Sequence, residues 1–147
     1  MGGPGSTRWG MTLTRLTTDG LPRLDVRALA RAGALRPGVT SMVSWGWGAN
    51  ISVHCPVDEP ARVVLAYRAH LAHDHRQDVQ ETIPVRLTPC AFGGQRSWFV
   101  CPGCGTRCAV LYAYWGVVRC RGCHHLTYAS TRCRRHHGTA GAQVGCR

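Results

Sequence analysis

Lysine is absent from the sequence, and acidic side chains are few. The 18 basic residues are all arginine, which indicates a GC-rich coding bias as much as a use for guanidinium groups. The 7 acidic residues all lie in the first 81 positions, so the segment from Thr82 onward contains nine arginines and no carboxylate side chain. The C-terminal part of the chain is therefore a polycation, and polyanions such as nucleic acids are its expected partners.

Long apolar runs are also absent. No stretch approaches the ~18 consecutive apolar residues of a membrane span, and Met1 to Leu16 lack the apolar run of a signal peptide. We therefore expect a cytoplasmic protein without a membrane partner. In such a compartment the 9 cysteines are predicted to be reduced thiols or metal ligands rather than disulfides.

Motifs for catalysis are missing as well. The sequence holds no P-loop, G-x-S-x-G or H-E-x-x-H pattern. His73-Asp74-His75 invites comparison with the HNH nucleases, but in that family the Asp-His element lies between two cysteine pairs, whereas here it precedes both. We therefore expect a non-enzymatic protein, with an HNH-like nuclease as the less favoured alternative.

Composition and periodicity divide the chain into four parts. Residues 1–20 form a Gly- and Arg-containing flexible arm, 21–90 a small domain, 91–130 a zinc ribbon, and 131–147 an Arg- and His-rich tail expected to be disordered. The predicted fold class is α+β. It consists of a small antiparallel β-meander with one short helix, followed by the C-terminal zinc ribbon.

The helix and the strands follow from local patterns. Asp25 is a candidate N-cap, because Val26 and Leu29 follow it on one stripe and Gly33 provides a stop. Segments with an alternation of period two predict the antiparallel meander, and shorter ones predict the strands of the ribbon. The meander segments are 39–47, 50–55, 62–69 and 79–87, and the ribbon segments are 98–100, 109–115 and 117–119.

The strongest pattern in the sequence is a pair of C-x₂-C knuckles. Cys101 and Cys104 form the first, Cys120 and Cys123 the second, and 15 residues separate them, a spacing typical of a Cys₄ zinc site. Four thiolates close the tetrahedron and leave no position for water, so we predict one structural Zn²⁺. Gly103 and Gly122 are expected to relieve crowding where the backbone turns around sulfur. Iron, or redox activity of either pair, remains an alternative.

Other cysteine and histidine residues leave alternatives open. Cys108, His124 or His125 could replace one of the four ligands, although Cys108 is expected to pack as a small apolar residue. Cys55 and Cys90 are expected to be ordinary buried thiols. A second metal site in the tail is left open, and its ligands would be Cys133, His136, His137 and Cys146.

Arginines alternate with aromatic residues throughout the ribbon, as in surfaces that bind phosphates and stack bases. The candidate nucleic-acid-binding residues are Arg96, Arg107, Tyr112, Tyr114, Arg119 and Arg121. Two alternatives are open. Both faces of the ribbon hairpin could be buried by packing, and the ribbon could dock a protein partner as an adaptor. The leading prediction is an accessory protein that binds DNA or RNA.

Five segments of the chain carry a further signal when they are taken together: Gly5 to Gly10, Leu35 to Gly38, Thr88 to Gly94, Trp98 to Gly105 and Leu126 to Ser130. They resemble an uncharacterised family of small bacterial and phage-associated zinc-ribbon proteins. The resemblance implies the four-cysteine site and the architecture but no activity. Three features depart from the family pattern: Thr7 in place of glycine, Cys108 in place of an aliphatic residue, and the tail after Ser130.

Overall fold

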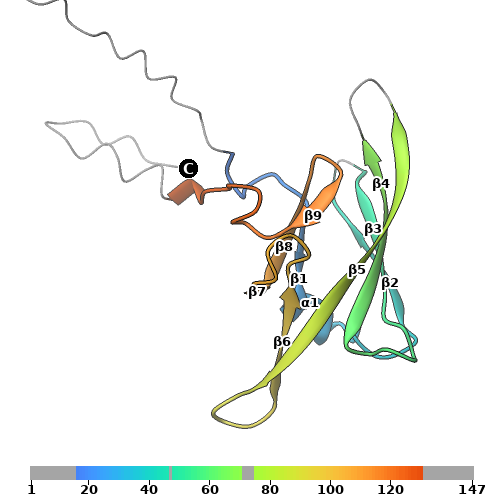
Figure 1. Ribbon diagram of the computed structural model, residues 1–147, viewed down its shortest axis with the longest axis vertical. Helices are drawn as coiled ribbons and strands as arrows, with labels where there is room; N and C mark the ends of the chain where they lie inside the picture. Colours follow the sequence, from blue (N-terminus) through green and yellow to red (C-terminus); the bar gives the residue numbers. More distant parts are fainter. Residues whose placement is uncertain (1–15, 47, 71–74, 131–147) are drawn as a thin grey trace, which may run out of the picture.

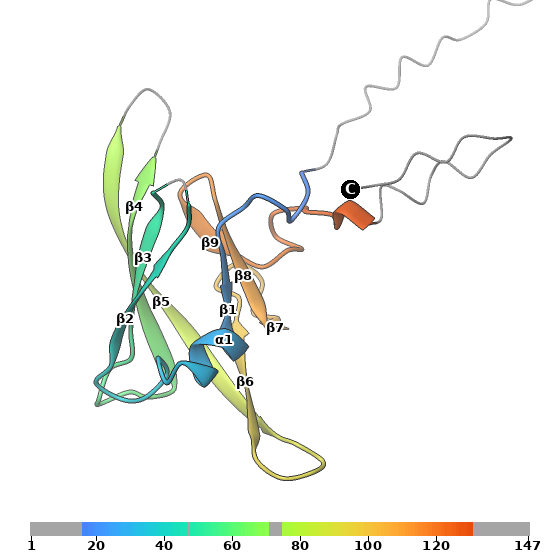
Figure 2. The ribbon, with the colours of Figure 1, turned by 180° about the vertical axis from the view of Figure 1, so that it is seen from behind.

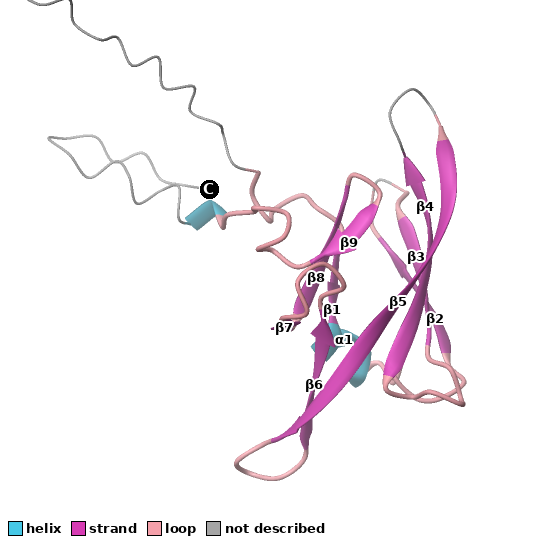
Figure 3. Cartoon of the chain, viewed as in Figure 1, coloured by secondary structure: helices cyan, strands magenta, loops and turns pink. Residues whose placement is uncertain are grey.

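A computed structural model describes residues 16–46, 48–70 and 75–130, which form a mostly β structure (Figures 1 and 3). The predicted α+β class is therefore wrong. The helix α1 (Val26–Arg31) has only 6 residues, whereas β5 (Arg76–Pro89) alone has 14. The reason is that the strands of the expected ribbon extend the meander and add a second sheet, while the helix only covers one end of the core. Most of the arm and the whole tail lie outside the described residues.

The larger sheet has six antiparallel strands in the order β2-β3-β4-β5-β6-β7, and it is curled. Its first four strands are the predicted meander, now with definite ends, and the last two belong to the expected ribbon. Besides β5, its strands are β2 (Thr40–Ser44), β3 (Asn50–His54), β4 (Arg62–His70), β6 (Gln95–Val100) and β7 (Arg107–Cys108).

The smaller sheet has three antiparallel strands in the order β1-β8-β9. Strands β8 (Val110–Tyr114) and β9 (Val117–Arg119) are the predicted hairpin, and β1 (Arg23–Asp25) is a strand that the sequence did not predict. Because β1 pairs with β8, residues from the expected first domain complete the sheet of the expected ribbon. The domain boundary near residue 90 stays a prediction.

Strand β5 changes its partner at Pro84. Arg62 of β4 is opposite Pro84, and the next residue, Val85, is opposite Phe99 of β6. Proline has no N–H group to continue a ladder, which suits it to a point where pairing changes. Beyond Pro84, β5 and β6 form a two-stranded hairpin that projects from the rest of the molecule, at the bottom of Figure 1. We call residues 85–99 the finger.

One hydrophobic core joins the two sheets. Val53, Val63 and Ile83 from the meander and Leu111 and Val118 from the smaller sheet are all 0% exposed and belong to the same cluster. Burying a side chain of this size contributes about 1.5–3 kcal/mol. The meander and the ribbon therefore stabilise each other through this shared core.

Helix α1 begins at its predicted N-cap. The Asp25 carboxylate accepts a hydrogen bond from the Arg27 backbone N–H at 2.9 Å, which confirms Asp25 as the N-cap. The Arg27 guanidinium also binds this carboxylate and lowers its pKa. Val26 and Leu29 are buried, and the helix lies beside β6 (Figure 2).

The end of the arm is attached to the C-terminal part of the ribbon. Thr17 and Thr127 form a parallel β-bridge, and the Thr18 N–H donates to the Thr127 carbonyl at 2.9 Å. Thr18 is only 6% exposed. The arm therefore packs on the ribbon from residue 16 onward.

Candidate metal centre

The first cysteine knuckle directly follows β6. The Gly105 N–H donates to the Cys101 carbonyl at 2.8 Å, and the Cys101 N–H donates to the Thr106 carbonyl at 3.0 Å. Gly105 has a φ of +71°, a conformation that favours glycine. These contacts close a tight turn that places the Cys101 and Cys104 side chains on the same side of the backbone.

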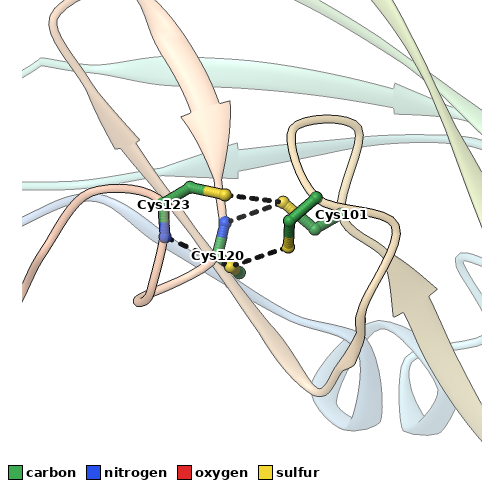
Figure 4. A group of neighbouring side chains, drawn as sticks. Cys101, Cys120 and Cys123 are labelled. Atoms are coloured by element: carbon green, nitrogen blue, oxygen red, sulfur yellow. Dashed lines mark hydrogen bonds between the residues drawn. The ribbon is translucent and has the colours of Figure 1, made fainter.

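The second knuckle follows β9 and faces the first. The His124 N–H donates to the Cys120 carbonyl at 3.2 Å, and the Cys123 N–H points at the Cys120 sulfur from 3.5 Å. The Cys120 N–H donates to the Cys101 Sγ at 3.3 Å, so the two knuckles contact each other directly. Figure 4 shows these contacts around Cys101, Cys120 and Cys123.

The four sulfur atoms of the knuckles form one cluster, all within 4.8 Å of one another. The Cys101 and Cys123 sulfurs are 3.8 Å apart, and those of Cys104 and Cys120 are 3.6 Å apart. Metal–sulfur bonds of about 2.3 Å in a tetrahedron would separate the sulfurs by about 3.8 Å, far beyond the ~2.05 Å of a disulfide bond. The cluster therefore has the size of a metal site and can hold one metal ion.

The four thiols differ in how readily they ionise. A hydrogen bond from the Thr106 hydroxyl is the main cause that lowers the pKa of Cys104, to about 6. Loss of hydration and the neighbouring thiols raise the pKa of Cys123 to about 12. Four negative sulfurs this close repel one another, and a divalent cation removes that repulsion, so metal binding should release protons from the cluster.

The cluster lies at the edge of the core. Cys101 is 1% exposed and Cys120 is 8% exposed, and both belong to the hydrophobic cluster that joins the sheets, whereas Cys104 is exposed. The metal centre is therefore part of the packing of the whole described structure.

The side chains considered as replacement ligands are placed elsewhere. Cys108 is opposite Phe99 in the β6–β7 pair, and burial raises the pKa of its thiol to about 12. The His124 Nε2 lies 2.9 Å from the Tyr112 carbonyl oxygen, and His125 is exposed. Cys55 is 0% exposed, as predicted. Cys90 is exposed in the turn of the finger, so its predicted burial is wrong; the sequence does not reveal that the finger projects.

Replacement of Gly103 by alanine should weaken the metal centre. A Cβ at Gly103 would lie 2.8 Å from Arg119 Cδ and 3.1 Å from Cys123 Sγ, and the Arg119 guanidinium is already held by Glu81. We expect a loss of about 1–2 kcal/mol of stability and a metal affinity lowered about tenfold. Thermal unfolding and competition with a chelator measure the two effects.

Gly122 supplies the matched control for this prediction. A Cβ there would meet only Cys120 Sγ at 3.7 Å, an ordinary van der Waals distance, so Gly122→Ala should change both quantities little. The sequence suggested that both glycines relieve crowding, whereas the structure shows a close approach at Gly103 alone. Equal effects of the two substitutions would contradict this difference.

The candidate nucleic-acid residues lie in different parts of the structure. Tyr112 is 5% exposed, and Arg119 forms an ion pair with Glu81, so both take part in packing. Tyr114 packs edge-on against Trp115 and His124. The Arg121 guanidinium covers the Tyr128 ring, 4.7 Å from its centroid. Of the six candidates, Arg96 and Arg107 are the two that are exposed on the larger sheet.

The strand register adds three residues that were not among the candidates from the sequence. Arg86 is opposite Trp98, Thr88 is opposite Arg96, and Arg107 is opposite Val100. Directly paired residues share one face of a sheet, as do residues two apart on one strand. The outward face of β5, β6 and β7 therefore carries Arg86, Thr88, Arg96, Trp98 and Arg107 together, and we call it the basic face. The sequence contains a signal for this face, because Arg86 and Thr88 are two residues apart, as are Arg96 and Trp98. It could be interpreted only once the pairing of β5 with β6 was known.

Several sequence-based predictions fall on residues that the structure does not describe. They include most of the His73-Asp74-His75 element and the open second metal site at Cys133, His136, His137 and Cys146. In the described part of the chain, no helix is long and apolar enough to cross a membrane.

Comparisons of the chain with protein-family models, curated proteins and solved structures found no match. The resemblance to small zinc-ribbon proteins therefore stays a prediction, and the functional argument below depends on the site and its surroundings alone.

Proposed function

We propose that the four knuckle thiolates hold one Zn²⁺ with a structural role. The sulfur separations of 3.6 and 3.8 Å support a tetrahedral ion of this size. Four sulfur ligands favour zinc or iron over hard cations, and two knuckles at ribbon spacing favour zinc. With all four positions taken by protein ligands, the ion has no open site for water, which supports a non-catalytic role.

We further propose that the protein is a non-enzymatic accessory factor that binds nucleic acid through the basic face. The observation that carries this proposal is the strand register, which places three arginines on one outward sheet face around Trp98. Arg86, Arg96 and Arg107 are all exposed. Guanidinium groups bind phosphate oxygens through paired hydrogen bonds, so three on one face match successive phosphates of a nucleic acid.

Trp98 holds part of the basic face in place. Its Nε1–H donates to the Thr88 hydroxyl at 2.8 Å, and the Arg96 guanidinium stacks on its ring, 4.1 Å from the centroid. Because the ring is half-buried and covered by Arg96, it orients the arginine rather than offering a free surface for bases. The basic face is therefore suited to contact phosphates, independently of base sequence.

The charge around the basic face is uncompensated. The sequence has no acidic side chain after Glu81. Among the described residues, the arginines in ion pairs are Arg27, Arg62, Arg68 and Arg119, none of which belongs to this face. A phosphate backbone would supply the missing negative charge.

Removal of the three arginines should weaken DNA binding and its dependence on salt. For the Arg86→Ala/Arg96→Ala/Arg107→Ala variant we expect affinity for a short duplex to fall at least about tenfold, and the slope of log K against log [salt] to decrease by about three. Fluorescence anisotropy titrations at several salt concentrations measure both quantities.

A control variant separates the basic face from total charge. Arg23, Arg31 and Arg76 are exposed and lie on β1, α1 and the start of β5, so replacing them by alanine removes the same charge from other surfaces. We expect this triple variant to keep most of the affinity. Equal losses in the two triple variants would contradict a localised binding face.

An adaptor that docks a protein is the second candidate. Trp115 is 67% exposed and Val117 is 40% exposed at the β8–β9 turn, which gives the smaller sheet an apolar end. A pull-down from the native host, with and without nuclease, distinguishes the two functions. Recovery of a partner that resists both nuclease and salt, and is lost in Trp115→Ala, would favour the adaptor.

A further inference from the structure

The tip of the finger carries a phenylalanine that none of the described residues covers. Phe92 is 104% exposed, as open as in an isolated peptide, although a ring of this size is normally buried. The turn that carries it is the most distant part of the finger from the core, at the bottom of Figures 1 and 2. The ring adds no buried apolar surface to the folded protein. Its presence at the tip therefore points to a role in binding.

The turn fixes the backbone that carries the ring. The Cys90 N–H donates to the Gly94 carbonyl at 3.1 Å, and the Gly93 N–H donates to the Cys90 carbonyl at 3.2 Å. Gly93 and Gly94 have φ values of +91° and +80°, which only glycine adopts at little cost. The tip is therefore a hydrogen-bonded turn at the end of a β-hairpin. A ligand that binds it would not lose free energy by ordering a flexible loop.

The basic face lies directly behind the tip. Arg96 is four residues from Phe92 and Arg86 is six, so at about 3.3 Å per residue they lie within about 13 and 20 Å of it along the strands. The grooves of B-DNA are about 7.5–8.5 Å deep, which is less than the distance from the tip to Arg96. The finger can thus reach the base pairs with its tip while its arginines stay at the phosphates.

We infer that Phe92 is a wedge that inserts between neighbouring base pairs of duplex DNA and locally unstacks them. This inference rests on the proposed function, because the arginines must first bring the tip to the duplex. Apolar side chains of proteins that bind the minor groove insert between base steps in this way and kink the duplex.

Duplex DNA fits the finger better than the other nucleic acids do. Proteins that bind single strands present several aromatic rings to successive bases, whereas the finger has one free ring and Trp98 is covered by Arg96. Double-stranded RNA has a deep and narrow major groove that excludes protein side chains.

The inference is tested with a DNA duplex that contains 2-aminopurine, whose fluorescence rises when the base is unstacked. We expect the fluorescence to rise when the wild-type protein binds. Phe92→Ala should lose the rise and bind about tenfold more weakly, with an unchanged salt slope, since stacking and phosphate contacts are separate contributions. Phe92→Leu should keep part of the rise, because leucine also serves as a wedge.

Leu87 supplies the matched control. It is an apolar residue of the same finger, 57% exposed, and it lies away from the tip, so Leu87→Ala should keep the full fluorescence change. Circular dichroism should show all variants folded, because neither side chain is buried. Tight, salt-dependent binding by the wild type without a fluorescence change would overturn the wedge and leave the proposed function standing. A lack of salt-dependent binding would overturn both.

Discussion

Replacement of Cys101 by serine is expected to abolish metal binding and to unfold residues 95–128 at room temperature. Each knuckle supplies half of a four-sulfur cluster, and binding of structural zinc contributes about 10–16 kcal/mol to folding in small zinc peptides. The strands of this segment are short, and the hairpin of β8 and β9 cannot compensate for its ordering entropy without the ion. Hydrogen exchange should show loss of protection at the amides of β8 and β9.

The effect should also extend beyond the ribbon. Cys101 and Cys120 share a hydrophobic cluster with Val53, Val63 and Ile83, and β6 pairs with β5. An unfolded ribbon would therefore expose the buried apolar side chains of the meander. We expect the thermal midpoint of what remains to fall by on the order of 10 °C.

Cys108 is the control for this prediction. Cys108→Ser changes one thiol in the same segment outside the four-sulfur cluster, and should keep one bound ion and the fold at a cost of about 1 kcal/mol. Retention of the metal and of the protected amides in Cys101→Ser would show that these thiols are not its ligands.

Replacement of Glu81 by alanine is expected to destabilise the protein by about 2–3 kcal/mol, because it leaves a largely buried charge without its partner. Glu81 on β5 pairs with Arg119 on β9, and their side chains are only 17% and 25% exposed. The Tyr67 hydroxyl lies 3.2 Å from the Glu81 carboxylate and also 3.2 Å from the Gly116 carbonyl oxygen. This network ties the smaller sheet to the larger one.

Chemical denaturation measures the loss, and the titration of Tyr67 reports on the network itself. Burial and, after it, the charge of Glu81 raise the pKa of Tyr67 to about 12, so removing the carboxylate should lower it. Asp78→Ala is the matched control. Asp78 on β5 pairs with Arg68 on β4 at 2.9 Å, but the side chains are 80% and 61% exposed, so its loss should cost less than about 1 kcal/mol. A similar cost for both substitutions would contradict the role assigned to Glu81.

Features that depend on neighbours in the chain could be predicted from the sequence. The Asp25 cap, the ends of the meander strands to within a few residues, and the four-cysteine cluster all follow from residue types at fixed short spacings. A C-x₂-C pair fixes the positions of its two sulfur atoms relative to each other through the short turn between them. The sequence could therefore predict the four-cysteine site although it did not predict the fold class.

Features that depend on which strands meet could not be predicted. Nothing local indicates that residues 23–25 pair with β8, or that β5 passes Pro84 and exchanges β4 for β6. For the same reason the sequence left open whether one face of the ribbon hairpin or both are buried, and Leu111 and Tyr112, on opposite faces of β8, are both buried. The basic face became visible only with the register that opposes Arg86 and Trp98.

The central claim is that Cys101, Cys104, Cys120 and Cys123 together hold one zinc ion. X-ray absorption at the zinc edge, on the reduced full chain loaded with one equivalent of Zn²⁺, tests it most directly. We predict a first shell of four sulfur atoms at about 2.3 Å. A shell with fewer than four sulfurs, or with nitrogen at about 2.0–2.1 Å, would contradict the claim.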